Sequence, residues 1–219
     1  MSPKNLNAQN KTHRLLLKKL KDKRISQIYK RFEKNFKINQ NFIVAVSGGA
    51  DSLALSFLTK VYSIKNSLTV KYYIVDHKLR HNSTLETNLV KDLFKKNFIN
   101  TDILNWNGEK PVSNIQSTAR KKRYKLLINK AKKLKINNIL TAHHIDDLYE
   151  NFFIRILRGS GLRGLASFDK NTYYDKINFL RPLIEFEKED LVYITKKVFM
   201  YYIKDPSNDD DKFTRVRIR

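Results

Sequence analysis

Six consecutive residues, Ser47-Gly-Gly-Ala-Asp-Ser52, have the types and spacing of a phosphate-binding loop. Gly48 and Gly49 let backbone amides approach an anion closely, and a helix starting here presents free N–H groups at its positive end. Ser47 and Ser52 add hydroxyl donors. Asp51 fits a phosphate site if Mg²⁺ joins its carboxylate to the phosphates. The alternative is a plain strand-to-helix turn, but Ser-Gly-Gly-x-Asp-Ser after an apolar strand favours phosphate binding.

A second polar group occupies residues 141–151, Thr-Ala-His-His-Ile-Asp-Asp-Leu-Tyr-Glu-Asn. On a helix, Asp147 and Glu150 stand three residues apart, and Asp146 and Glu150 stand four apart, so these carboxylates share a face. Like charges this close disfavour each other, which indicates a bound cation: Mg²⁺, an ammonium group, or both. The alternatives are an aspartate at a helix N-terminus and a hydrogen-bonded histidine pair. Zinc is disfavoured, because a His-x-x-x-His or cysteine pattern is missing.

Arginines accompany both groups. Residues 155–165 form a cationic, glycine-rich stretch that contains Arg155, Arg158, Gly159, Gly161, Arg163 and Gly164. Such a stretch suits phosphates of RNA or ATP. An ordinary helix C-terminus would explain Arg158 and Gly159, but not the glycine spacing beyond them. Upstream, Arg120 and Arg123 stand one helical turn apart.

These groups need a scaffold, and hydrophobic periodicity predicts one. Strands are expected at 42–46, 68–75, 101–106 and 138–142, and helices at 26–36, 52–63, 84–96, 114–134 and from 144 to before Gly159. This alternation predicts an α/β fold with a doubly wound, mainly parallel sheet covered on both faces. A hairpin at 173–180, a helix at 187–200 and a polar loop at 205–211 follow. We therefore expect a basic N-terminal arm and helix (1–40), an α/β domain (41–165) and a small C-terminal extension (166–219).

The composition excludes several classes of protein. The 219 residues include no cysteine, which excludes disulfides, thiolate metal sites and a catalytic thiol, and fits a cytoplasmic setting. No apolar run approaches the roughly 18 residues of a membrane span, so no membrane partner is expected. The basic stretch at 11–24 could be a transit peptide, but it is rich in lysine rather than in arginine and serine.

The formal net charge is +23, with 44 Lys and Arg against 21 Asp and Glu. Such a field favours a polyanionic partner such as nucleic acid. The alternative is codon bias, because the sequence is crowded with the amino acids of AT-rich codons. Arginines are the more informative cations, since that bias does not supply them.

Together these segments resemble the tRNA(Ile)-lysidine synthetase family, which belongs to the N-type ATP pyrophosphatases. No lysine follows the glycines, which separates the loop from that of kinases and GTPases. Residues 76–80 and 158–161 separate the chain from GMP and NAD synthetases. The matching segments run in family order from residue 42 almost to Arg219, namely 47–52, 75–80, 116–124, 141–151, 158–165, 181–183 and 205–208.

The resemblance implies an adenine nucleotide alpha hydrolase-like fold and a two-step reaction. ATP adenylates the C2 oxygen of the wobble cytidine in a tRNA(Ile) with anticodon CAU. The ε-amine of L-lysine then displaces AMP to form lysidine.

The resemblance also implies a role for each matched residue. Residues 47–52 and His143 bind ATP, Asp51 holds Mg²⁺, and Asp147 and Glu150 hold lysine. Arg120 and Arg123 stabilise the charge that develops on phosphate and on the C2 oxygen. The RNA contacts are assigned to Arg155, Arg158 and Arg163.

Two other functions stay open. A non-enzymatic nucleotide- or RNA-binding module would keep the loop but would not need the acidic cluster. Another ATP-dependent amidating synthetase would need an ammonia source, and the chain has no cysteine for a glutaminase. Many lysidine synthetases have further C-terminal domains for the acceptor stem, so the chain is expected to be an N-terminal catalytic domain or a short form. A homodimer is one option that the sequence does not decide.

Overall fold

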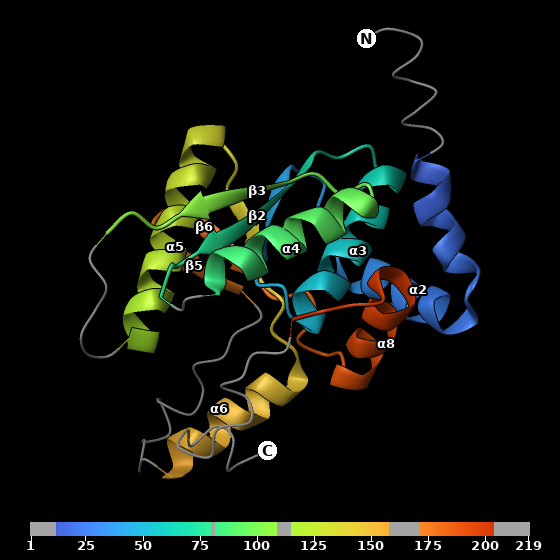
Figure 1. The fold of residues 1–219 in the computed structure, drawn as a ribbon. Helices are drawn as coiled ribbons and strands as arrows, with labels where there is room; N and C mark the ends of the chain where they lie inside the picture. Colours follow the sequence, from blue (N-terminus) through green and yellow to red (C-terminus); the bar gives the residue numbers. More distant parts are fainter. Residues whose placement is uncertain (1–11, 80–81, 109–114, 158–170, 204–219) are drawn as a thin grey trace, which may run out of the picture.

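The computed structural model describes residues 12–79, 82–108, 115–157 and 171–203 (Figure 1). Its centre is a six-stranded sheet with the strand order β3-β2-β1-β4-β6-β5. The strands are β1 (Phe42–Val46), β2 (Val70–Asp76), β3 (Thr101–Asn105), β4 (Asn138–Leu140), β5 (Asn171–Tyr174) and β6 (Ile177–Leu180).

The sheet is parallel except at one edge. β1 pairs in parallel with β2 and β4, so that Val44 lies opposite both Tyr72 and Leu140. β2–β3 and β4–β6 are also parallel, whereas β5 and β6 form an antiparallel hairpin. The chain runs from β1 outward to β3 and then returns to the other side of β1 for β4. The crevice between the carboxyl ends of β1 and β4 is therefore a topological switch point, where open α/β sheets bind ligands.

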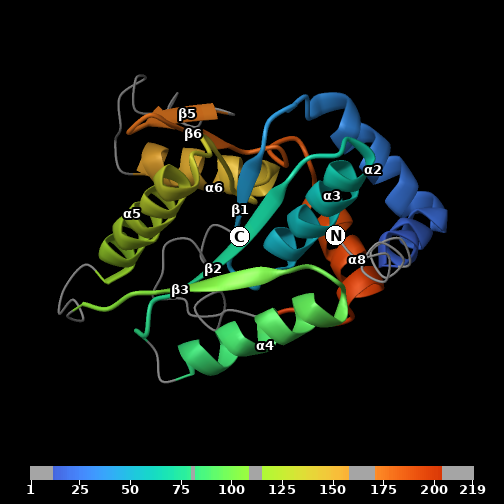
Figure 2. The ribbon, with the colours of Figure 1, turned by 90° about the horizontal axis from the view of Figure 1, so that it is seen from above.

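Helices cover both faces, as the alternation of strands and helices predicts. In the described parts of the chain they are η1 (Lys19–Lys21), α2 (Lys23–Asn35), α3 (Ala50–Lys65), α4 (Ser83–Lys96), α5 (Ile115–Leu134), α6 (Ile145–Leu157) and α8 (Lys188–Phe199). Figure 2 shows α3 and α8 on one side of the central strands and α5 on the other. The doubly wound, mainly parallel sheet is thereby confirmed.

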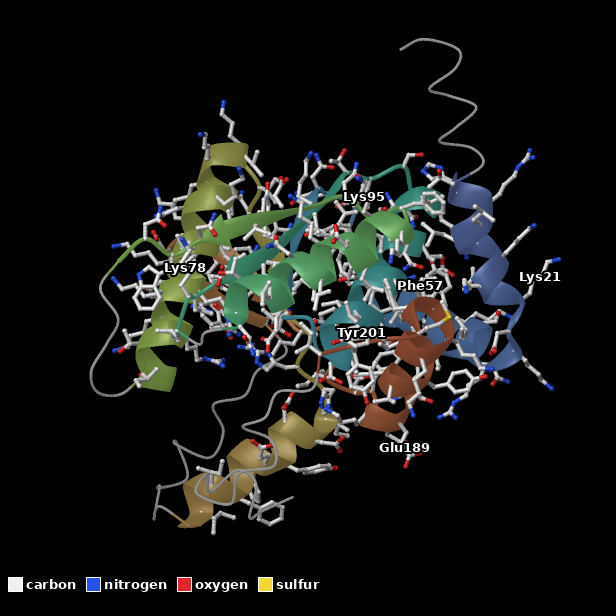
Figure 3. The ribbon with its side chains drawn as sticks, viewed as in Figure 1. Lys21, Phe57, Lys78, Lys95, Glu189 and Tyr201 are labelled. Carbon is white, nitrogen blue, oxygen red and sulfur yellow. The ribbon has the colours of Figure 1, made fainter. Side chains whose placement is uncertain are left out.

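Alternating side chains of β1 pack into two separate hydrophobic cores. Phe42, Val44 and Val46 point into the larger core, with α2, α3, α4 and α8. Ile43 points into the smaller core, where Leu127 and its neighbours on α5 pack. This is the period-two pattern of a strand buried on both faces. Figure 3 shows lysine side chains such as Lys21 and Lys95 extending outward from this framework.

Several boundaries differ from those expected. α2 begins at Lys23 rather than at residue 26, because the carboxylate of Asp22 accepts a hydrogen bond from the Ile25 amide at 3.1 Å and caps the helix. β4 ends at Leu140, and residues 141–144 leave the strand to enter the candidate site. The polar loop expected at 205–211 lies outside the described residues.

The last described part of the chain contributes to the same sheet and core. β6 pairs with β4, and α8 packs on α3 through buried side chains that include Leu191, Ile194 and Val198. The expected hairpin at 173–180 is confirmed by β5 and β6. A domain boundary near residue 165 stays a prediction. None of the described helices is long and apolar enough to cross a membrane.

Candidate active site

The loop between β1 and α3 has the backbone of an anion cradle. Gly48 has φ +88°, and a Cβ there would lie 2.8 Å from Val90 Cγ2, so a glycine is required. The hydroxyl oxygen of Ser52 accepts hydrogen bonds from the amides of Ser47 and Gly48 at 3.2 Å each. The same hydroxyl donates a hydrogen bond to the carbonyl of Gly49 at 2.9 Å. These bonds hold the loop in a closed turn.

The first turn of α3 directs its amides toward the same point. Gly49 is the N-cap and has no side chain to satisfy the first N–H groups of this 16-residue helix. Ala50, Asp51 and Ser52 follow in its first turn, where the helix dipole is positive. Residues 47–52, six of the seven residues predicted to bind ATP, therefore lie in one turn at the switch point.

The carboxylate of Asp51 is the acidic group of this loop. Its Oδ2 lies 3.2 Å from Lys188 Nζ and 3.5 Å from His144 Nε2. Burial raises the pKa of Asp51, but the imidazole of His144 and the ammonium of Lys188 lower it more, so the net pKa falls below its usual value. Oδ1 is buried and has no hydrogen-bond partner among the described residues.

That buried Oδ1 suits Mg²⁺, which takes hard oxygen ligands. Among the described residues, no group of three or more histidines and carboxylates is arranged to hold a metal ion. Magnesium commonly uses one or two carboxylates together with substrate phosphates and water, so a complete protein cage is not needed. Asp51 at the mouth of the phosphate loop fits that arrangement.

His144 joins the loop to the acidic helix α6. Its side chain is 2% exposed, and its Nε2 lies 3.5 Å from Asp51 Oδ2 and 3.6 Å from Asp147 Oδ2. On the other side of the ring, Nδ1 lies 3.4 Å from Asp146 Oδ2. Burial lowers the pKa of His144, but the carboxylates of Asp51 and Asp147 raise it more, so the net pKa rises. The geometry therefore favours an imidazolium between carboxylates.

Asp147 and Glu150, the predicted lysine ligands, lie on α6 one turn apart. Asp147 Oδ2 accepts a hydrogen bond from the backbone amide of His144 at 3.1 Å. This is the side-chain-to-backbone bond that the acidic residue makes in a capping box, here at the start of α6. Glu150 is 4% exposed, whereas the side chain of Asp146 is 53% exposed. Asp147 therefore has a structural role besides any ligand role, and Glu150 is the more deeply buried acid.

The two histidines at 143 and 144 differ in their surroundings. His143, predicted to contact ATP, is half-buried, and its Nδ1 lies 3.0 Å from the hydroxyl of Thr141. The Thr141 amide in turn donates to Leu180 O on β6. His144 belongs to the same sequence motif but was assigned no ligand role from it, and it is the histidine in contact with the acidic cluster.

Arg120 and Arg123, which were predicted to act together, lie in different surroundings in the structure. Arg123 Nε donates to His77 Nε2 at 3.2 Å, which ties the guanidinium to the carboxyl end of β2. Arg120 is exposed on α5, where its Nη2 lies 3.2 Å from Tyr124 Oη. Arg123 is thus directed to the edge of the sheet that carries the loop, and Arg120 lies on the helix surface.

Hydrogen bonds of Asp76 and His77 fix the backbone and side chains at the carboxyl end of β2. Asp76 is 1% exposed and accepts hydrogen bonds from the Lys78 amide, Ser83 Oγ and Thr84 Oγ1 at 2.7–2.9 Å. Burial and the charge of Arg123 lower the pKa of His77 to about 4. His77 is therefore neutral near pH 7, and because its Nε2 accepts from Arg123, the proton resides on Nδ1.

The predicted RNA contacts fall largely outside the described part of the chain. Arg155 is on α6, but its side chain is not among those described, and Arg158 and Arg163 lie in the segment 158–170. Their assignment to RNA stays a prediction from the sequence.

Sequence reasoning missed Lys188 altogether. It comes from the first turn of α8 and contacts Asp51. One lysine among 44 basic residues has no local motif to mark it, and α8 follows no glycine loop. Its proximity to the loop arises from the packing of α8 on α3.

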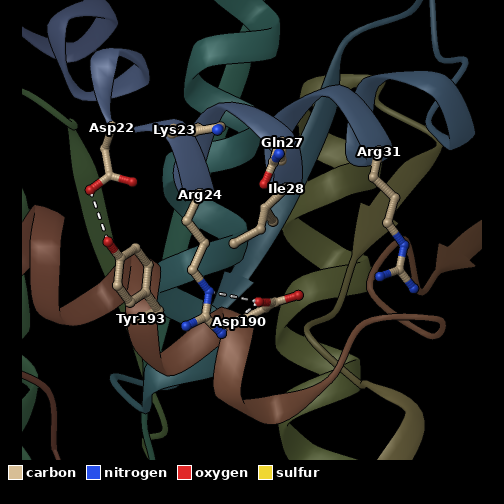
Figure 4. Close-up of a pocket in the computed structure, with 8 residues that line it drawn as sticks. All are labelled: Asp22, Lys23, Arg24, Gln27, Ile28, Arg31, Asp190 and Tyr193. Carbon is tan, nitrogen blue, oxygen red and sulfur yellow. Dashed lines mark hydrogen bonds and ion pairs between the residues drawn. The ribbon is translucent and has the colours of Figure 1, made fainter.

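A hollow of about 690 Å³ lies elsewhere, between α2 and α8. Two contacts between its lining residues link the helices: Arg24 Nη2 lies 2.9 Å from Asp190 Oδ1, and Tyr193 Oη donates to Asp22 Oδ2 at 2.9 Å (Figure 4). These contacts join α2 to α8. We assign the chemistry to the carboxyl edge of the sheet, where the loop and the acidic helix meet.

Comparison with known proteins agrees with this geometry. A profile of the PP-loop domain matches residues 18–219. The tRNA(Ile)-lysidine synthase of Orientia tsutsugamushi (strain Boryong) is 38% identical over 185 residues, which cover 84% of this chain and 42% of that protein. That of Rhodopseudomonas palustris is 38% identical over 179 residues, covering 81% of this chain and 52% of the other. The chain thus spans about half the length of these curated relatives.

A solved structure shares the fold. The U34-tRNA thiolase NcsA of Methanococcus maripaludis, determined with its [4Fe-4S] cluster, superposes with a TM-score of 0.72. The two sequences are 18% identical, and the match covers 84% of this chain and 66% of NcsA. This likeness concerns the arrangement of strands and helices.

Proposed function

Because this chain belongs to the PP-loop family, we propose that it uses ATP to attach L-lysine to the wobble cytidine of a tRNA(Ile) with anticodon CAU. The C2 oxygen of the cytidine attacks the α-phosphate of ATP, and pyrophosphate leaves. The ε-amine of lysine then attacks C2, and AMP leaves with that oxygen. The relatives named tRNA(Ile)-lysidine synthase support this reaction. Since the chain spans about half their length, the tRNA activity belongs to the proposal.

The observation that carries the proposal is the contact of one buried imidazole with two functional elements. His144 lies 3.5 Å from Asp51 on the phosphate loop and 3.6 Å from Asp147 on the acidic helix. Activation by ATP and capture of an amine need adjacent sites, because the adenylated base must meet lysine without diffusing away. A simple nucleotide-binding module would not need this acidic cluster beside its loop.

Different residues of the chain would bind phosphate, bind lysine and stabilise the charge that develops during the reaction. The amides at the start of α3 bind phosphate oxygens, and Asp51 would hold Mg²⁺, which when bound neutralises phosphate charge. Asp147 and Glu150 would hold lysine as a cation and deliver its amine after loss of a proton. Arg123, oriented by His77, would stabilise negative charge on the reacting phosphate and the C2 oxygen. A cytoplasmic location is part of the same proposal.

Incubation with Mg·ATP, radiolabelled lysine and tRNA tests the reaction. We expect lysine to enter tRNA(Ile) with a CAU anticodon, but not the same tRNA with uridine at the wobble position. The nucleotide products should be AMP and pyrophosphate. ADP as the main product would contradict the assignment of the loop.

Two aspartate variants test the site. Asp51→Asn should fold and lose turnover, because it removes the proposed metal ligand from the edge of the core. Asp175→Asn is the matched control, since Asp175 is a surface residue paired with Lys132. Normal turnover by Asp51→Asn would remove Asp51 from the mechanism.

A further inference from the structure

Trp106 is the only tryptophan of the chain, and it follows the last residue of β3 at the carboxyl edge of the sheet. Its backbone amide donates to the carbonyl of Asp76 at 2.9 Å, which continues the pairing of β2 and β3 by one residue. The side chain is 8% exposed. A large aromatic ring is therefore fixed at the same edge of the sheet as the phosphate loop, although no step of the proposed reaction uses it.

The indole also contacts its own loop and α5. A Cβ on Gly108 would lie 2.6 Å from the indole Nε1, so any side chain at residue 108 would displace the ring. Lys122 of α5 has its Nζ 6.0 Å from the centre of the indole. Figure 1 shows the carboxyl ends of β2 and β3 beside α5. The position of the ring is thus set by β2, α5 and the residues that follow β3.

The aromatic partner of this indole is His77, the residue that follows β2. The two rings meet at an interplanar angle of 81° and a centroid distance of 6.4 Å, which is the geometry of an edge-to-face pair. His77 Nε2 accepts the hydrogen bond from Arg123 Nε at 3.2 Å. Trp106, His77 and Arg123 therefore form a continuous series of contacts from β3 through β2 to α5.

This series of contacts needs a neutral imidazole. Nε2 of His77 faces the guanidinium of Arg123, and the buried Nδ1 has no hydrogen-bond partner among the described residues. A second proton on the ring would displace the bond from Arg123 and would repel its charge. Burial and Arg123 lower the pKa of His77, and the carboxylate of Asp76 raises it by less. Removal of the indole that packs on His77 would let water reach the imidazole and would reduce this burial.

We propose that Trp106 is a positioning residue, which holds the imidazole of His77 against the guanidinium of Arg123 and keeps water away from it. The inference rests on the proposed function, in which Arg123 stabilises negative charge on the reacting phosphate and the C2 oxygen. A charged donor stabilises such charge most when its orientation is fixed before the reaction begins. Trp106 fixes that orientation through His77, so it needs no contact with a substrate.

Nuclear magnetic resonance of the full chain tests the positioning without turnover. Trp106→Leu removes the aromatic ring, and Trp106→Phe keeps one. In Trp106→Leu the pKa of His77 should rise from about 4 toward 6.5, and the Nε–H proton of Arg123 should exchange faster with water. Trp106→Phe should keep both properties close to those of the unmodified chain. The His77 signal is identified by its absence in His77→Gln.

Phe94→Leu is the matched control for lost aromatic packing. Phe94 is fully buried and packs with Tyr72 and Phe199, away from the series of contacts that includes His77. Phe94→Leu should leave the pKa of His77 and the exchange of the Arg123 proton unchanged. A rise of the His77 pKa in this variant would indicate general loosening of the fold and would overturn a specific role of Trp106.

The pH profile of lysine transfer to tRNA tests the consequence for the reaction. With a pKa near 6.5, about three quarters of His77 would be protonated at about pH 6. The kcat of Trp106→Leu at about pH 6, divided by its value at about pH 8, should therefore be up to about fourfold lower than the same ratio for the unmodified chain. Trp106→Phe should restore the ratio.

Three results would overturn the proposal. The first is a His77 pKa near 6.5 in the unmodified chain, which needs no variant to fold. The second is an unchanged His77 pKa in Trp106→Leu, and the third is a raised pKa with an unaltered pH profile. If the unmodified chain transfers no lysine, the proposed function fails, and the pKa of His77 and the exchange of the Arg123 proton still decide whether Trp106 holds this pair.

Discussion

His144 Nε2 lies 3.5 Å from Asp51 Oδ2, which places a residue at the start of α6 against the first turn of α3. The two pKa values shift in the directions of an ion pair, upward for His144 and downward for Asp51, although burial alone would shift each the other way. The two groups that the sequence singled out separately therefore meet at the carboxyl ends of β1 and β4.

Lysine selectivity should depend on the acids of α6. Glu150→Gln and Asp147→Asn each remove one carboxylate from the proposed pocket for the lysine ammonium, and an unpaired partner there would cost about 2–5 kcal/mol. The KM for lysine should rise strongly, while ATP binding changes little. Asp146→Asn, at a side chain 53% exposed, is the control. A normal lysine KM in both variants would place the pocket elsewhere.

The loop should tolerate alanine at one glycine and not at its neighbour. Gly48→Ala forces an L-residue to φ +88° and puts a Cβ 2.8 Å from Val90 Cγ2. We expect it to lower the free energy of unfolding by about 2 kcal/mol or more and to weaken ATP binding. Gly49 has φ −73°, and the nearest atom to its Cβ would be 3.8 Å away, so Gly49→Ala should cost far less. Equal losses in denaturant titrations would contradict the strained turn.

The stability of the chain should depend on His77 in mildly acidic solution. Its pKa is about 4 in the folded chain and 6.5 in its ordinary state, so the unfolded chain binds the proton more readily. The contribution of neutral His77 is complete above about pH 6.5 and is lost as the pH falls toward 4. Lowering the pH from about 7.5 to about 5 should therefore cost about 2 kcal/mol more in the unmodified chain than in His77→Asn. Urea unfolding at both pH values measures this difference, and parallel losses would contradict the burial of a neutral His77.

Binding to tRNA should depend on the arginines of residues 155–165 more than on other cations. Removing one cation that neutralises an RNA phosphate should lower the slope of log K against log salt by roughly 0.7 to 0.9. Arg158→Ala with Arg163→Ala should therefore weaken binding and flatten its salt dependence, with ATP cleavage less affected. Lys132 and Lys133 on α5 provide the comparison pair, although Lys132 is also paired with Asp175 at 2.6 Å. Filter binding at several salt concentrations that gave equal losses for both pairs would favour a diffuse field of charge.

Local patterns were sufficient for the scaffold and the loop. The strand at 42–46, the glycines after it and the helix that follows could be predicted because backbone propensity, hydrophobic period and turn chemistry act over a few residues. The alternation of such units predicts a parallel sheet, since a strand that continues through a helix to the next strand folds back in parallel. Asp51 and the acids of α6 were recognisable for the same reason, because each belongs to a short motif.

The partners of those residues were decided by tertiary structure. The strand order that sets β4 beside β1 brings His144 to Asp51, the packing of α8 on α3 brings Lys188 there, and α5 brings Arg123 to His77. No spacing in the sequence encodes these pairs, because hydrogen bonds and charges act through space between elements that are remote along the chain. The sequence by itself determined which groups could bind phosphate and an amine. The packing of distant helices on one sheet decided which side chains surround them and what charge they carry.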